Sequence, residues 1–161
     1  MLPAASDLST ELLVVTVLFG CIFVKISTLD LLYYKIPNIL SGTLALTGII
    51  TVFGMDVSML FSHMLSGFIS FLLFFWLGAY LFRRLQQEAF GIGDAKLIGA
   101  CTIWIGPMGI PSALFIASFL ACMMALFTKL AQKLYPKSKV AFGPYLCIGT
   151  YIVWLYGPLT I

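Results

Sequence analysis

The sequence predicts an all-α membrane protein, with about six transmembrane helices in one domain that covers residues 1–161. Hydrophobic residues make up 61% of the chain, and its mean hydropathy is +1.09. Charged residues make up only 9%, whereas soluble domains average about 25%. The apolar residues also gather in stretches that approach the roughly 20 residues needed to cross a bilayer. Composition, hydropathy and spacing therefore favour the same class.

Six apolar stretches follow one another without a linker or an internal repeat, and we expect each to be a helix. They cover residues 11–29, 36–54, 59–82, 93–107, 110–130 and 141–158. The fourth stretch is short, because Gly106 and Pro107 end it before Gly109 and Pro111 begin the next. The first stretch is preceded by acidic and not basic residues. We therefore expect a permanent helix there and not a signal peptide.

The basic residues predict the orientation of the chain, because cytoplasmic loops carry an excess of Lys and Arg. With the N-terminus outside, all nine basic residues fall at the inner side: Lys25, Lys35, Arg83, Arg84, Lys96, Lys129, Lys133, Lys137 and Lys139. The outer segments hold Asp7, Glu11 and Asp56. This pattern predicts both termini outside, and loops 31–35, 83–92 and 131–140 in the cytoplasm. We expect the protein to lie in the inner (cytoplasmic) membrane of the cell.

Two aspartates fall at the same predicted membrane face. Asp30 ends the first apolar stretch, and Asp94 begins the fourth, within Gly91-Ile92-Gly93-Asp94. An acid at such a depth costs roughly 2.5–3.5 kcal/mol on insertion scales, which suggests a function. The two glycines leave room for another backbone or a substrate. The start of the last stretch, residues 141–145, lies at this face as well.

A pair of carboxylates at close range predicts general acid–base chemistry. Like charges and desolvation disfavour double ionisation, so the pair holds one proton near neutral pH. One carboxylate can then take a proton from water while the other, protonated, polarises a peptide carbonyl. Such hydrolysis needs no cofactor. Two aspartates alone would also make a poor metal site.

Two other interpretations of the aspartates stay open. They could be solvated interfacial charges matched to nearby lysines, or parts of a proton relay in a small transporter, although a relay favours acids at mid-membrane. The single histidine, His63, is expected to pack between helices. The four cysteines, Cys21, Cys101, Cys122 and Cys147, are expected to be small buried apolar residues. No basic run with interleaved aromatics points to nucleic acid.

Three stretches resemble the type IV prepilin peptidases, a bacterial group of GxGD membrane aspartic peptidases. The nine residues from Asp30 to Asn38, which include Ile36-Pro37-Asn38, resemble the first-aspartate motif. The seven residues from Gly91 to Leu97 resemble the second, and Phe142-Gly143-Pro144 resembles a short motif near the last helix. Three motifs in order over nearly the whole chain are more specific than GxGD alone.

The resemblance implies an endopeptidase that removes the basic leader of prepilins or pseudopilins at the cytoplasmic membrane face. It also implies that the cut precedes the hydrophobic N-terminal helix of the mature pilin. By the same resemblance, Asp30 and Asp94 are the catalytic pair. Substrate binding is assigned to the other motif residues: Gly91, Gly93, Lys96, Pro37, Asn38, Phe142, Gly143 and Pro144. On a helix, Lys96 points about 200° away from Asp94. It could therefore reach lipid headgroups or an acidic residue of the substrate.

The chain also departs from the family pattern. Longer members carry a cytoplasmic insertion with paired cysteines and also methylate the new pilin N-terminus. Here the first inner loop spans only residues 31–35, so the chain is similar to the short, peptidase-only form. Ala141 stands where many relatives have proline. The additional signatures of presenilin-like GxGD proteases are missing.

Overall fold

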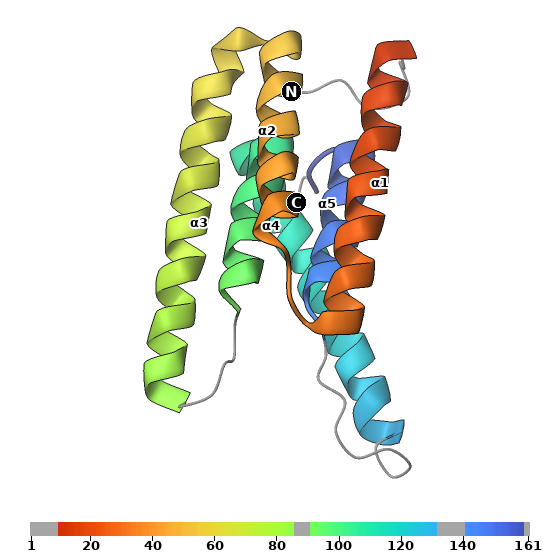
Figure 1. Cartoon of the computed structure of the whole chain (residues 1–161), viewed down its shortest axis with the longest axis vertical. Coiled ribbons are helices and arrows are strands. Elements are labelled where there is room, and N and C mark those ends of the chain that lie inside the picture. The colour runs from red at the N-terminus through yellow and green to blue at the C-terminus, as the bar shows by residue number, and fades with distance from the viewer. Residues whose placement is uncertain (1–9, 86–90, 132–140, 160–161) are drawn as a thin grey trace.

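The computed structural model describes residues 10–85, 91–131 and 141–159, and these residues form five helices and no strand (Figure 1). The helices are α1 (Thr10–Tyr33), α2 (Asn38–Met55), α3 (Val57–Leu85), α4 (Ile92–Ala131) and α5 (Gly143–Tyr156). All but α5 contain a segment long and apolar enough to cross a membrane. The predicted all-α class is confirmed, with four candidate membrane spans among the described residues.

The six predicted helices correspond to five elements, because two of the predicted helices lie within α4 on either side of a kink. The stretches expected at residues 93–107 and 110–130 are joined in one element, and the helical geometry breaks only at Gly106, where φ is 72° and ψ is 178°. Pro107 directly follows the break, at a position where a helix start does not require a backbone N–H. The two halves of α4 nevertheless run in opposite directions (Figure 1). The break was predicted at this glycine and proline, and a single non-helical residue is enough to reverse the chain.

His63 stabilises this reversal. In an unbroken helix, the carbonyl of Ile103 would accept the N–H of residue 107, but Pro107 has none. The buried His63 ring supplies the missing donor, with Nδ1 at 2.8 Å from the Ile103 oxygen. Because a carbonyl can only accept, Nδ1 carries the proton in this contact. The prediction of a packing histidine is confirmed.

The core lies between α1, α2, α4 and α5 and is built around Trp104. The Phe19 ring of α1 stacks on Trp104 at a centroid distance of 4.0 Å, and Trp154 of α5 meets it edge-on at 5.3 Å. The indole N–H of Trp104 donates to the Leu44 carbonyl of α2 at 2.7 Å. Gly48 permits this approach, since a Cβ there would lie 2.7 Å from the indole. Aromatic packing thus fixes the first half of α4 against α1, α2 and α5.

The cysteines follow the prediction only in part. Cys101 and Cys147 are buried, whereas Cys21 and Cys122 are exposed at the protein surface, and all four are free. The expectation of burial was wrong for the latter two. An apolar sequence environment does not distinguish a side chain that faces the core from one that faces lipid.

Candidate active site

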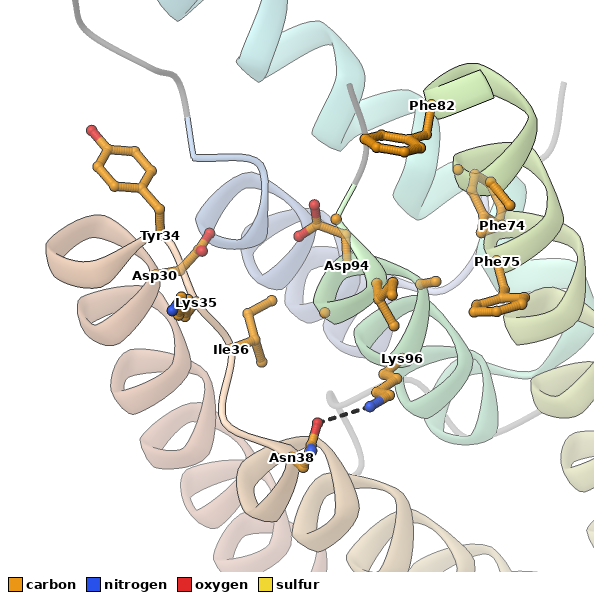
Figure 2. A pocket seen from close by; sticks show the side chains of 16 residues that line it. Asp30, Tyr34, Lys35, Ile36, Asn38, Phe74, Phe75, Phe82, Asp94 and Lys96 are labelled. Atoms are coloured by element: carbon orange, nitrogen blue, oxygen red, sulfur yellow. Dashed lines mark hydrogen bonds between the residues drawn. The ribbon is translucent and has the colours of Figure 1, made fainter. Parts of the chain in front are cut away.

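A cavity of about 630 Å³ opens where α1 ends and where α2 and α4 begin (Figure 2). Its walls come from three regions that are distant in the sequence. The end of α1 and the loop after it supply Asp30, Tyr34, Lys35 and Ile36, followed by Asn38 of α2; α3 supplies Phe74, Phe75, Gly78, Ala79 and Phe82; and residues 91–96 complete the wall. The cavity therefore combines charged groups with an aromatic wall.

Asp30 lies in the last turn of α1, and only 6% of its surface is exposed. Its Oδ2 accepts a hydrogen bond of 3.0 Å from the backbone N–H of Gly143, the first residue of α5. The N-terminus of a helix carries partial positive charge, so this position favours a carboxylate. A Cβ at residue 143 would lie 2.5 Å from Oδ2. Glycine is required here because the carboxyl group occupies the space of a side chain.

Asp94 lies in the first turn of α4 and is partly exposed. Its carboxyl group accepts a hydrogen bond from the Gly91 backbone N–H. Gly93 serves a different contact: a Cβ there would lie 3.3 Å from Cβ of Ile36. The loop between α1 and α2 can therefore pass close to the start of α4. This close approach is the one anticipated for the glycines of the GxGD stretch.

The two carboxyl groups lie on opposite walls of the cavity and face the space between α1 and α4 (Figure 2). They are 64 residues apart in the sequence, yet both stand at helix ends that meet at one end of the bundle (Figure 1). The arrangement can hold a proton, a water molecule or a peptide carbonyl between two acids. The catalytic role of the pair stays a prediction.

Lys96 forms a contact that the sequence did not indicate. Its Nζ donates to Asn38 Oδ1 at 2.8 Å, and this bond joins the first turns of α2 and α4 (Figure 2). Both residues line the cavity. The bond therefore links two of the residues to which the sequence assigned substrate binding.

The predicted site residues fall into two groups. Six of them line the cavity: Asp30, Asp94, Gly91, Gly93, Lys96 and Asn38. The remaining four, Pro37, Phe142, Gly143 and Pro144, are not part of its wall, and Gly143 acts from behind by holding Asp30.

The aromatic wall of α3 was not predicted. Phe74, Gly78 and Phe82 are spaced four residues apart and thus share one helix face. Gly78 within that face and Ala79 beside it are small residues in an otherwise bulky helix, and they are the signal in the sequence that could have marked the wall. Lys35 and Ile36, which also line the cavity, belong to the first-aspartate motif but were not assigned a role.

The fold and the site define a class: all-α membrane proteins in which two apolar helices each bring one aspartate to a shared cavity. The sequence model of the type IV leader peptidase family matches residues 13–126. This match covers most of the chain and includes both aspartates. The protein therefore belongs to the type IV leader peptidase family.

Several curated proteins are similar to this chain. A type 4 prepilin-like proteins leader peptide-processing enzyme of Escherichia coli is 29% identical over 127 residues, which cover 76% of this chain and 44% of the relative. Two proteins named prepilin leader peptidase/N-methyltransferase are also 29% identical. The one from Dickeya chrysanthemi aligns over 81% of this chain and 46% of its own length, and the one from Xanthomonas campestris over 88% and 49%.

The chain thus spans about half the length of the curated relatives it matches. No solved structure matches it significantly.

Proposed function

We propose that this protein is an aspartic endopeptidase of the membrane that removes the leader peptide of type IV prepilins or pseudopilins. The observation that carries the proposal is the cavity of about 630 Å³ with Asp30 and Asp94 on opposite walls. Family membership and the names of the relatives support the substrate class. In this proposal Asp30 and Asp94 are the catalytic residues.

The reaction follows from the chemistry of two carboxyl groups that share one proton. The ionised carboxylate takes a proton from water, whose oxygen attacks the scissile carbonyl carbon while the protonated carboxyl donates to the carbonyl oxygen. As the tetrahedral intermediate collapses, the C–N bond breaks and the leaving amine takes up the proton that came from water. One hydroxyl of the intermediate returns its proton to the second carboxylate, which restores the pair. A neighbouring backbone group orients each aspartate: the Gly143 N–H orients Asp30, and the Gly91 N–H orients Asp94.

We further propose that the chain crosses the inner membrane six times, with the cavity at the cytoplasmic face. The opposite directions of the two halves of α4 support two crossings within that element (Figure 1). Lys35, Arg83, Arg84 and Lys96 all lie at or beside the helix ends around the cavity, as the positive-inside rule expects of a cytoplasmic face. Other parts of the predicted inner loops, residues 86–90 and 132–140, lie outside the described residues.

Co-expression with candidate prepilins, in a host that lacks its own prepilin peptidase, tests the function. We expect a prepilin to lose its leader, visible as a smaller band on a gel, with the unaltered chain and not with Asp94→Asn. If no prepilin or pseudopilin of the source organism is shortened, or if Asp94→Asn shortens it equally, the proposal is wrong.

A further inference from the structure

A second cavity, of about 610 Å³, lies on the flank of the bundle between α2, α3 and α4. It is mostly apolar, and five of its twelve lining residues are glycine or alanine: Gly42, Ala45, Gly67, Gly99 and Ala100. Its rim is open to the surroundings, since Gly42 is exposed and Phe68 is 59% exposed. We call this cavity the flank groove.

The flank groove is continuous with the cavity that holds the two aspartates. Asn38 and Lys96 line both, so their hydrogen bond is a shared boundary. From this boundary the groove follows α2 from Asn38 to Ala45 and α4 from Lys96 to Ile103. At 1.5 Å per residue it extends roughly 10 Å along the helices. It leads from the aspartates toward the middle of the candidate membrane spans.

At the base of the groove, α3 and α4 pack against each other at two glycines. A Cβ at Gly67 would lie 3.0 Å from the Gly99 oxygen, and a Cβ at Gly99 would lie 3.0 Å from the Gly67 oxygen. The backbones of α3 and α4 therefore lie close together at these two buried glycines, and the side chains of Ile103 and Phe71 pack beside them. In a bilayer, helices associate through close packing on small residues, because burial from lipid gives little driving force. The groove therefore offers an open, mostly apolar surface with several small residues, of the kind on which a membrane helix can pack.

We propose that the flank groove binds the apolar helical segment of the peptide substrate, next to the scissile bond. This inference rests on the proposed peptidase function. A membrane-anchored substrate that is cut between Asp30 and Asp94 must continue from there into the bilayer. The flank groove begins at the boundary of the catalytic cavity and runs in that direction. A helix seated in it holds the scissile bond beside the two aspartates.

Two glycines of α2 offer a matched pair of variants. Gly42 lies in the groove and Gly54 does not, yet a Cβ at either position meets no atom within 4 Å. The Cβ of a leucine at either position therefore meets open space, and leucine favours a helix more than glycine does. Cleavage is measured on a full-length prepilin and on a shortened peptide that spans the scissile bond but lacks the apolar segment.

We expect Gly42→Leu to lower kcat/KM for the full-length prepilin by about tenfold or more, because the blocked groove removes substrate binding energy. The shortened peptide should be cleaved at the unaltered rate, and Gly54→Leu should leave both rates unchanged. Equal cleavage of the prepilin by both variants would overturn the inference, as would an equal loss on both substrates with Gly42→Leu. No cleavage by the unaltered protein would instead overturn the proposed function on which the inference rests.

Photo-crosslinking gives an independent readout of binding. A benzoylphenylalanine in place of Phe68, in the groove, is compared with one in place of Phe119, which is also 59% exposed but lines neither cavity. Both are placed in the Asp94→Asn protein so that the prepilin stays intact. We expect crosslinks to the apolar segment from position 68 and not from 119. Crosslinks to lipid alone at position 68, or equal crosslinks at both positions, would contradict the inference.

Discussion

At the scale of residues, the position of Asp30 depends on Gly143. The glycine donates its N–H to the carboxylate at 3.0 Å and leaves the space that the carboxylate occupies. Asp30 itself is visible in the sequence, because an acid at the end of an apolar stretch is unusual. Its contact with residue 143 depends on how α1 and α5 are placed, and no local pattern encodes that placement. The resemblance marked Gly143 for substrate binding, which stays a prediction; the structure adds its hydrogen bond to the aspartate.

Gly143→Ala should therefore impair catalysis without unfolding the protein. The new Cβ would lie 2.5 Å from Oδ2, so the carboxyl group must move. A displacement of about 1 Å at a catalytic group can cost about 10²-fold in rate. Cleavage of a prepilin by purified protein measures the effect, and thermal unfolding checks the fold. Cleavage within about twofold of the unaltered rate would show that the Gly143 contact does not position Asp30.

The hydrogen bond between Lys96 and Asn38 leads to a second prediction, on how variants of these two residues affect cleavage. If its role is to join α2 to α4 beside the cavity, Lys96→Ala and Asn38→Ala should lower cleavage by similar factors, and the double variant should lose no more than either single one. If Lys96 instead meets an acidic residue of the substrate, its replacement should cost more than that of Asn38. Unaltered cleavage by Lys96→Ala would exclude both roles.

At the scale of elements, the sequence located the helices well but not their connections. The break at Gly106 was anticipated from its glycines and prolines. It is one residue long, and the His63 ring donates to the carbonyl of Ile103, for which Pro107 has no N–H. The aromatic wall of α3 escaped prediction for a different reason. Phenylalanines in an apolar helix look alike in sequence, whether they face lipid or a cavity.

The packing of α2 on α4 can be tested with two glycines of the same helix. A Cβ at Gly48 would lie 2.7 Å from the Trp104 ring, whereas a Cβ at Gly54 would be free. Overpacking of this kind typically costs about 1–3 kcal/mol. We expect Gly48→Ala to lower the unfolding temperature in detergent, and Gly54→Ala to leave it unchanged or slightly raised. Equal unfolding temperatures for the two variants would contradict the described packing.

The turn between α2 and α3 makes a pH-dependent contribution to the stability of the fold. Asp56 Oδ1 accepts hydrogen bonds from the hydroxyl and the N–H of Ser58, at 2.7 and 2.9 Å, and these bonds lower the pKa of Asp56 below its ordinary 3.8. A lowered folded-state pKa stabilises the fold above 3.8, and this stabilisation disappears as the pH falls through the lowered value. Asp56→Ala should thus be less stable than the unaltered chain at pH 7, by a margin that shrinks at strongly acidic pH. A margin that is constant with pH would contradict this account.

At the scale of the whole molecule, the two aspartates meet because α1 ends, and α2, α4 and α5 begin, at one end of the bundle (Figure 1). The alternation of apolar stretches was enough to predict that both acids share a depth. The walls around them could not be predicted, because they combine the end of α1, the second half of α3 and the first turn of α4. Only the packed fold brings these together.

Reporter fusions test the proposed orientation of the whole chain. A cytoplasm-dependent reporter and a periplasm-dependent one, each placed after Asp56 and after Ser138, should give opposite signals at the two positions. The expectation follows from nine basic residues at one predicted side and none at the other. Identical signals at both positions would refute the six-span orientation.

The pH profile of cleavage tests the two-aspartate mechanism most directly. Purified protein is assayed with a prepilin as the unaltered chain, Asp30→Asn and Asp94→Asn, with thermal unfolding as the control for folding. We expect a bell-shaped profile with two apparent pKa values that belong to the pair. Each variant should lose at least about 10²-fold in rate, because one carboxyl group cannot both activate water and protonate the carbonyl. Cleavage near the unaltered rate by either variant would contradict the mechanism.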